Sequence, residues 1–289
     1  AIVGDVMLPL SSADEAKPGA WRVVTYLTPE GNRKVTDQEI AFLERFRALG
    51  GIDRHFNWLF FTSGDSREPE LAGIRGALVG TALTLLVTLA LCVPIGVLAA
   101  IYLEEFAPRN RLTDLIEVNI NNLAAVPSIV FAVSGLLLSL FVFRNILPLY
   151  GTLTLLVAVH VIHRLSFGTR VTNAAIIAVS EELEEAAAAC GAGRRDVISR
   201  ILLPLIAPTL INAFFWIALL TLRELTLATI LFSPNNITLS VVIWSLWNSG
   251  QHGPAAAMSL IMILLMLPVM ILYWRIGNRV GDALSGTRN

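Results

Sequence analysis

The sequence predicts an all-α polytopic membrane protein with about five membrane-spanning helices. Apolar residues make up 55% of the 289-residue chain and charged residues only 15%, whereas about a quarter of the residues of a soluble domain are charged. The mean hydropathy is +0.69. The apolar residues gather in blocks that reach the roughly 20 residues a helix needs to cross a bilayer. A net charge of −1 gives no indication of a nucleic-acid partner.

A small polar region, residues 1–73, precedes the first apolar block. Within it, residues 36–50 carry apolar side chains at helical spacing, and Thr36 and Glu39 are spaced for a capping box. No enzyme site is recognisable in this region. The chain opens with Ala1 and no signal-peptide pattern follows it, so we expect a further transmembrane helix upstream.

Five apolar blocks then predict the membrane helices. The first contains Pro94 and Gly96, and such breaks are tolerated where neighbouring helices satisfy the freed backbone. A charged amphipathic stretch at 104–122 follows, and we expect it at the membrane surface. The predicted spans are 75–103, 123–143, 149–168, 205–232 and 254–274.

The polar loop between the third and fourth spans has a distinctive form at 181–204. Four glutamates open a helix, where the positive helix N-terminus favours them. Four alanines follow, and Gly191 permits a sharp turn before a second short helix. Pro204 then begins the next span. We expect a rigid helix-turn-helix whose small side chains let another protein close around it; an ordinary solvated loop is the alternative.

The distribution of arginines predicts which ends of the spans face the cytoplasm. If the 181–204 loop is cytoplasmic, the opposite short loops hold only Arg144, and 233–253 holds no Lys or Arg. This asymmetry agrees with the positive-inside rule and makes the N-terminal region extracytoplasmic. The arginines on the predicted cytoplasmic side are Arg109, Arg111, Arg170, Arg194, Arg195, Arg200, Arg275 and Arg279.

Several polar residues fall inside predicted spans, where ionisable groups usually face a protein interior or a water path. Arg223 and Glu224 are therefore candidate pathway residues, with contacts to a neighbouring helix as the alternative. His160 and His163 lie three residues apart on one helix face, a possible metal-ligand spacing that lacks a third ligand, so we favour packing. Cys92 and Cys190 have no metal-ligand spacing, and we expect neither a metal site nor a catalytic site.

Residues 181–204 resemble the EAA loop of the membrane subunits of ATP-driven, binding-protein-dependent importers. Glu185-Ala186-Ala187 is followed at the family's spacing by Gly191, and Ile201 to Pro204 comes nine residues later. In that family the loop inserts into a cleft of the cytoplasmic ATPase subunit. By position, the coupling-loop residues are Glu185, Ala186, Ala187, Gly191, Arg194, Ile201 and Pro204.

The resemblance implies a MetI-like ABC importer transmembrane domain at 74–282, in a multi-pass protein of the bacterial inner membrane. It implies as partners an ABC ATPase dimer, a second permease subunit, a periplasmic or extracellular substrate-binding protein and membrane lipid. ATP and Mg²⁺ would bind the partner ATPase, so this chain needs no cofactor and is no enzyme. The sequence contains no GxxxxGK[ST] motif.

The two halves of the chain resemble permeases of different substrates. Residues 1–143, with FNWLFFTSGDSREPELAGIRGALVG at 56–80, resemble phosphate-transporter permeases. Residues 148–289, with LRELTLATILFSPNNITLSVVIWSLWNSG at 222–250, resemble iron(III)-transporter permeases. The chain thus reads as a hybrid with a seam near 140–148. We favour phosphate import; the alternatives are iron(III) import, a non-transporting scaffold, and an intramembrane enzyme using His160, His163 and Glu224.

Overall fold

The computed structural model describes residues 2–3, 22–23, 27, 29–32, 35–52, 55–64 and 73–285. The chain divides into two compact units, 1–58 and 59–289. In the first, helix α1 (Asp37–Ala48) begins with the predicted capping box, because Thr36 Oγ1 accepts from the Glu39 amide at 3.2 Å and the Thr36 amide donates to Glu39 Oε2 at 2.8 Å. Its other elements are η2 (Glu30–Asn32) and the antiparallel strands β1 (Ile2–Val3) and β2 (Arg22–Val23), with Ile2 opposite Val23.

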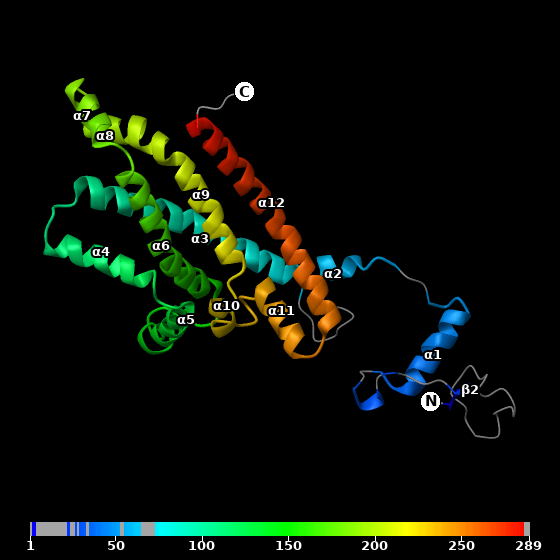
Figure 1. The fold of residues 1–289 in the computed structure, drawn as a ribbon. Coiled ribbons are helices and arrows are strands. Elements are labelled where there is room, and N and C mark those ends of the chain that lie inside the picture. The colour runs from blue at the N-terminus through cyan, green and yellow to red at the C-terminus, as the bar shows by residue number, and fades with distance from the viewer. Residues whose placement is uncertain are drawn as a thin grey trace. The chain divides into compact units, whose positions relative to one another are not determined.

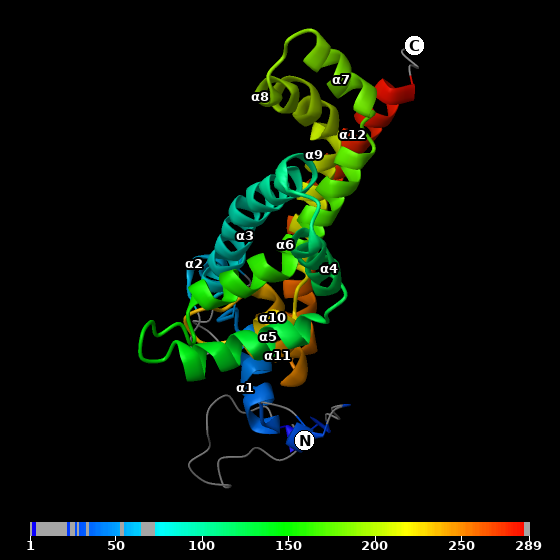
Figure 2. The same ribbon diagram turned by 90° about the vertical axis from the view of Figure 1, so that its left-hand side faces the viewer.

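The described part of the second unit is helical, as the sequence predicts. Helices α3, α6, α9 and α12 are the long elements; α3 packs on α6 and α9, and α9 also packs on α6 and α12 (Figures 1 and 2). The helices are α2 (Trp58–Thr62), α3 (Arg75–Ile101), η3 (Tyr102–Phe106), α4 (Arg111–Leu123), α5 (Ser128–Leu137), η4 (Leu138–Val142), α6 (Leu153–Ile177), α7 (Glu181–Ala189), α8 (Arg194–Val197), η5 (Ile198–Leu202), α9 (Leu203–Leu222), α10 (Thr226–Ile230), α11 (Leu239–Asn248) and α12 (His252–Ser285).

Three of the described helices are long and apolar enough to cross a membrane: Arg75–Phe106, Arg194–Leu222 and His252–Gly277. A fourth span is formed if α4 and α5–η4, which meet at a bend of 107°, are counted together. Most of the stretch 104–122, which we expect at the membrane surface, therefore belongs to α4, the first helix of this bent pair. Helix α6 has 25 residues, a spanning length, but its histidines and arginines lower its hydropathy.

The span predicted at 205–232 is broken. Helix α9 ends at Leu222, and the short helix α10 starts at Thr226. The sequence TLRELTLATILF gives little warning of this break, because its residues are mostly apolar helix formers. Arg223 and Glu224 therefore lie in a gap between two helices and not inside one continuous span, and this corrects the sequence-based prediction.

The two ends of the helical unit are formed by different sets of short helices. Helices α7 and α8 lie at one end, together with the described end of α12, and α5, α10 and α11 lie toward the other (Figures 1 and 2).

Cys92 is fully buried in α3 beside Ile217 and Ala218 of α9, consistent with a small packing residue. Cys190 is exposed, and both thiols are free.

Candidate functional site

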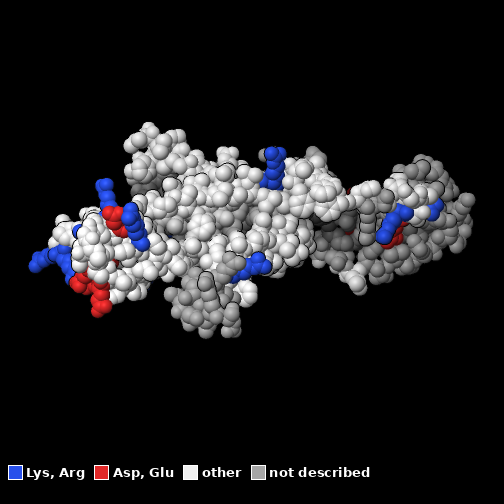
Figure 3. Space-filling model, turned by 90° about the horizontal axis from the view of Figure 1, so that it is seen from above, with Lys and Arg blue, Asp and Glu red and all other residues white. Residues whose placement is uncertain are grey.

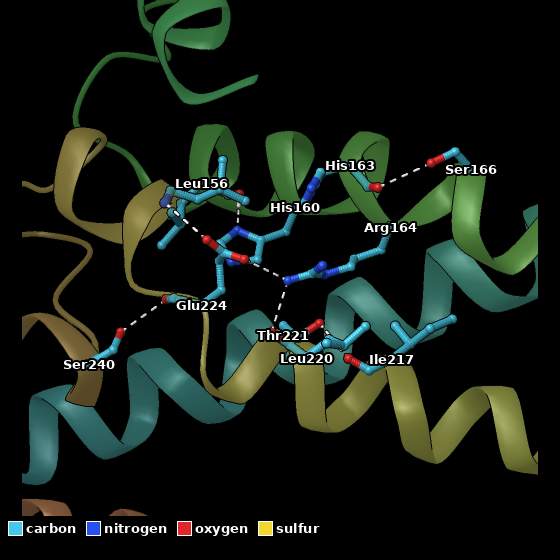
Figure 4. A network of polar contacts seen from close by, with 11 residues as sticks. Leu156, His160, His163, Arg164, Ser166, Ile217, Leu220, Thr221, Glu224 and Ser240 are labelled. Atoms are coloured by element: carbon cyan, nitrogen blue, oxygen red, sulfur yellow. Dashed lines mark hydrogen bonds and ion pairs between the residues drawn. The ribbon is translucent and has the colours of Figure 1, made fainter. Parts of the chain in front are cut away.

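A buried ion pair joins α6 to the break between α9 and α10. Arg164 Nη2 lies 2.7 Å from Glu224 Oε2, and the exposed fractions of the two side chains are 9% and 12%. Figure 4 shows Arg164 pointing from α6 toward the carboxylate of Glu224. The pair brings together a residue that the sequence analysis named, Glu224, and one that it missed, Arg164. An arginine inside an apolar span is itself a signal of a functional site.

The ion pair also satisfies the two helix ends created by the break. Arg164 Nη2 donates to the Leu220 carbonyl at 2.9 Å, one of the four last carbonyls of α9 that lack a partner within the helix. Glu224 Oε1 accepts from the Leu227 amide in the first turn of α10 at 3.5 Å. The cation thus sits at a helix C-terminus and the anion at a helix N-terminus, the arrangement that the helix dipole favours.

The backbone of the break is tied to α11. Ser240 Oγ donates to the Glu224 carbonyl at 3.2 Å, and the Leu239 amide donates to Thr81 Oγ1 of α3 at 2.9 Å. Thr221 uses its hydroxyl within α9, donating to the Ile217 carbonyl at 2.8 Å. Helices α6 and α11 therefore bond the break directly, and α3 supports it through the start of α11.

A cavity of about 10 Å³ lies beside Glu224, lined by Thr81, Thr84 and Thr221 among others. This is room for about one water molecule and not for a transported solute. Thr84 is 4% exposed, and its buried Oγ1 has no hydrogen-bond partner among the residues that the structure describes. A water here would satisfy that hydroxyl.

The other polar residues that the sequence analysis placed inside spans lie in different environments. Arg223 is exposed at the C-terminus of α9, whereas the Glu224 side chain is only 12% exposed. His160 is buried, with Nδ1 2.8 Å from the Leu156 carbonyl, and His163 packs against the ring of Phe131 at 4.9 Å. Among the described residues no three His, Cys, Asp or Glu side chains are grouped to hold a metal ion.

The polar loop has the predicted helix, turn and second helix. Helix α7 ends in a Schellman motif: Gly191 has φ +84°, its amide donates to the Ala188 carbonyl at 2.9 Å, and the Ala192 amide donates to the Ala187 carbonyl at 3.0 Å. The second helix differs in one respect. Residues from Arg194 run without interruption through the π-helical turn η5 into α9, so Pro204 lies inside a continuous helix and does not begin one.

The loop presents its charges to solvent. Figure 3 shows blue and red side chains gathered at the end formed by α7 and α8, whereas the described surface beside it is mostly white. Glu185, Ala186 and Gly191 are exposed, while Ala187 and Ile201 are half-buried. Further exposed charged residues are Glu181, Glu182, Arg194, Arg195, Asp196 and Arg200.

The chain matches a known protein family over most of its length. Residues 73–282 match the model of the binding-protein-dependent transport system inner membrane component. A probable ABC transporter permease protein of Bacillus subtilis, YqgI, is 30% identical over 266 residues, which cover 79% of this chain and 89% of that protein. A match of this extent includes residues 140–148, so similarity to one relative continues across the predicted seam.

Other relatives are named for several substrates. A putative 2-aminoethylphosphonate permease of Salmonella typhimurium, PhnV, is 24% identical over 65% of this chain and 69% of its own. The phosphate permease PstC 2 of Mycobacterium tuberculosis is 37% identical over 34% of this chain and 31% of its own. The Fe(3+) permease FbpB 2 of Haemophilus influenzae is 28% identical over 52% of this chain and 29% of its own. The resemblance to both phosphate and iron(III) permeases is thus confirmed as partial similarity.

Solved structures show the same fold. The MetNI methionine ABC transporter matches with a TM-score of 0.57 at 17% identity, over 72% of this chain and 94% of that chain. A bacterial ABC transporter that imports alginate matches with a TM-score of 0.59 at 17% identity, over 71% of this chain and 79% of that chain. Together with the family match, these likenesses show that the chain belongs to the ABC importer permease family of binding-protein-dependent transport systems, as a multi-pass, non-catalytic component of the bacterial inner membrane.

Proposed function

We propose that this permease imports inorganic phosphate, driven by ATP hydrolysis on a partner ATPase. The similarity to PstC 2 and the phosphate-permease resemblance of residues 1–143 support this substrate. The similarity to PhnV adds a second relative named for a solute with a tetrahedral phosphorus oxyanion. Arginine suits such an anion because its planar guanidinium binds phosphate oxygens in pairs.

The observation that carries the coupling proposal is the exposed, capped loop at 181–204. Its alanine-rich helix α7 and the left-handed Gly191 form a protruding knob with small side chains, which a groove on the ATPase can enclose. Glu185 and Ala186 are exposed on this knob. We assign docking on the ATPase dimer to Glu185, Ala186, Ala187, Gly191, Arg194, Ile201 and Pro204, with ATP and Mg²⁺ held by the ATPase.

We assign the solute pathway to the side of the α9–α10 break where Arg223 is exposed. Its exposed cation can meet an anion, whereas Glu224 is engaged by Arg164 and supports the break from inside. A second permease subunit would supply the opposite wall of the pathway, and a substrate-binding protein would deliver the anion. The remaining wall of each permease would face membrane lipid.

Uptake into proteoliposomes tests the proposal. The complete importer is reconstituted with its ATPase and binding protein, and labelled phosphate and labelled ferric iron are supplied in parallel. Phosphate uptake that needs ATP supports the proposal, while uptake of iron alone replaces it with the second candidate, which the similarity to FbpB 2 favours. Stable insertion without uptake or ATPase stimulation by either solute identifies a non-transporting scaffold.

Two substitutions test the docking role of the loop. Gly191→Asp places a charged side chain where φ is +84°, and Glu185→Lys reverses an exposed charge. Both are expected to reduce copurification of the ATPase and ATP-driven uptake. If association and uptake both survive these changes, the loop is not the docking element.

A further inference from the structure

Arg194 links the 181–204 loop to the end of α3. Its guanidinium Nη2 lies 3.8 Å from Glu105 Oε2, and its Cζ lies 4.5 Å from the centre of the Phe106 ring. Glu105 and Phe106 belong to η3, the π-helical turn that closes α3. The Glu105 side chain is 14% exposed and the Arg194 side chain 58% exposed, so the pair is shielded from water on the glutamate side, and the arginine is held in addition by the Phe106 ring.

The charges around Arg194 give it a specific role. Glu105 experiences repulsion from Glu184 of α7 and from its neighbour Glu104, and Arg194 supplies the opposing attraction. Without the arginine, the acidic face of α7 and the acidic end of α3 would repel each other. Arg195, the next residue, is exposed, and no ion pair is found for it among the described residues.

The other end of α3 touches the segment that holds the ion pair. Thr81 Oγ1 accepts from the Leu239 amide at 2.9 Å, and the adjacent Ser240 holds the Glu224 carbonyl at 3.2 Å. Between Thr81 and Glu105 the helix extends about 36 Å, at 1.5 Å per residue. Close packing supports it midway, because a Cβ at Gly96 would lie 3.2 Å from the Thr169 amide nitrogen of α6.

We infer that Arg194 is a positioning residue that fastens the coupling loop to α3, so that displacement of the loop is transmitted along α3 to the Arg164–Glu224 break. Packed interiors resist compression and transmit strain, and α3 contacts the loop region at one end and the α11 start at the other. The inference rests on the proposed docking of the loop on an ATPase. It adds a route from that docking site to the break.

Amide hydrogen exchange of the full-length chain in detergent tests the fastening, with no ATPase or solute present. Arg194→Ala is expected to speed exchange in 181–197 and 102–107 by about fivefold, the effect of losing one cation–π contact and one partly shielded ion pair. Arg195→Ala, the matched control, is expected to leave both segments unchanged. Glu105→Gln removes the ion pair and also the repulsion from Glu184 and Glu104, so its effect should be smaller than that of Arg194→Ala, and the double variant should add little to Arg194→Ala. Equal exchange in Arg194→Ala and Arg195→Ala would overturn the fastening.

Uptake per ATP hydrolysed tests the transmission, measured with labelled phosphate and labelled ferric iron in reconstituted complexes. This ratio corrects for any change in the amount of ATPase bound. Arg194→Ala is expected to lower it several-fold relative to Arg195→Ala, and an unchanged ratio would overturn the transmission. If the unaltered chain neither binds an ATPase nor transports either solute, the proposed function fails and the transmission with it, while the exchange result still decides the fastening.

Discussion

Arg164 and Glu224 lie 60 residues apart in the chain, yet their side chains meet at 2.7 Å where α9 gives way to α10. The pair does three things at once. It neutralises two charges inside a membrane protein, it satisfies the Leu220 carbonyl at the end of α9, and it accepts from the Leu227 amide at the start of α10. A break in a membrane helix needs such partners, since unsatisfied backbone groups are costly in the bilayer.

Glu224→Ala is expected to lower the free energy of unfolding by roughly 3 kcal/mol, because it leaves the buried Arg164 cation without its counter-ion. Denaturant titration in detergent micelles measures this effect. The double replacement Arg164→Met with Glu224→Leu is expected to recover the part of the loss that comes from the unpaired charge, but not the hydrogen bonds to the Leu220 carbonyl and from the Leu227 amide, and uptake should stay low. Recovery of both stability and uptake would show that the pair has no role in transport.

Arg223→Ala is expected to reduce uptake without reducing stability. Its side chain is exposed at the end of α9, so the change in unfolding free energy should stay within about 0.5 kcal/mol. Labelled phosphate uptake should fall, since the proposed anion contact is lost. Normal uptake by Arg223→Ala would remove this residue from the pathway.

Local signals made the loop predictable, whereas the ion pair depends on distant residues. Helix α7 and its turn follow from consecutive alanines and one glycine, and the α1 capping box follows from two residues three apart. The break at 223–225 has no local sequence signal, because its stability comes from Arg164 on another helix. Arg164 could have been singled out, as Glu224 was, by the rule that charges inside spans are rare, but the pairing of the two could not.

Gly80 is a second position where a contact with a residue far away in the sequence determines which side chain fits. A Cβ at Gly80 would collide with the Ile237 carbonyl oxygen, whereas a Cβ at Gly76 would meet only the Ile237 Cγ2 at an ordinary 3.7 Å. Gly80→Ala should therefore destabilise the protein by about 1–3 kcal/mol, as overpacking does, and Gly76→Ala should be nearly neutral. Thermal unfolding of both variants in detergent compares them, and similar midpoints would contradict the close approach.

Asn236 stabilises the connection between α10 and α11 through hydrogen bonds of its side chain. It is 3% exposed; its Oδ1 accepts from the Ser233 amide at 2.6 Å, and its Nδ2 donates to the Leu231 carbonyl at 2.8 Å. Asn236→Asp removes the donor and buries a charge, so we expect a loss of at least about 2 kcal/mol. Asn235→Asp, at the exposed neighbour, is the control and should have little effect on thermal stability. Equal loss in the two variants would show that charge alone matters here.

Gly191→Ala tests whether the left-handed turn shapes the coupling loop. At φ +84° a Cβ is strained, and the expected cost is about 1 kcal/mol. Gly193 offers a matched control, because it has φ −74° and ψ 159°, which alanine adopts readily, and a Cβ there would meet only Asp196 Oδ2 at 3.8 Å.

The strain should open the Schellman hydrogen bonds, so the amides of Gly191 and Ala192 are the ones to monitor. In Gly191→Ala the exchange of residues 191 and 192 should rise about fivefold, equivalent to about 1 kcal/mol, whereas Gly193→Ala should leave it unchanged. ATPase binding should weaken in the same order if the knob docks as one rigid shape. Faster exchange with undiminished ATPase binding would mean that the partner holds the loop in shape by itself and that the turn serves only the free permease.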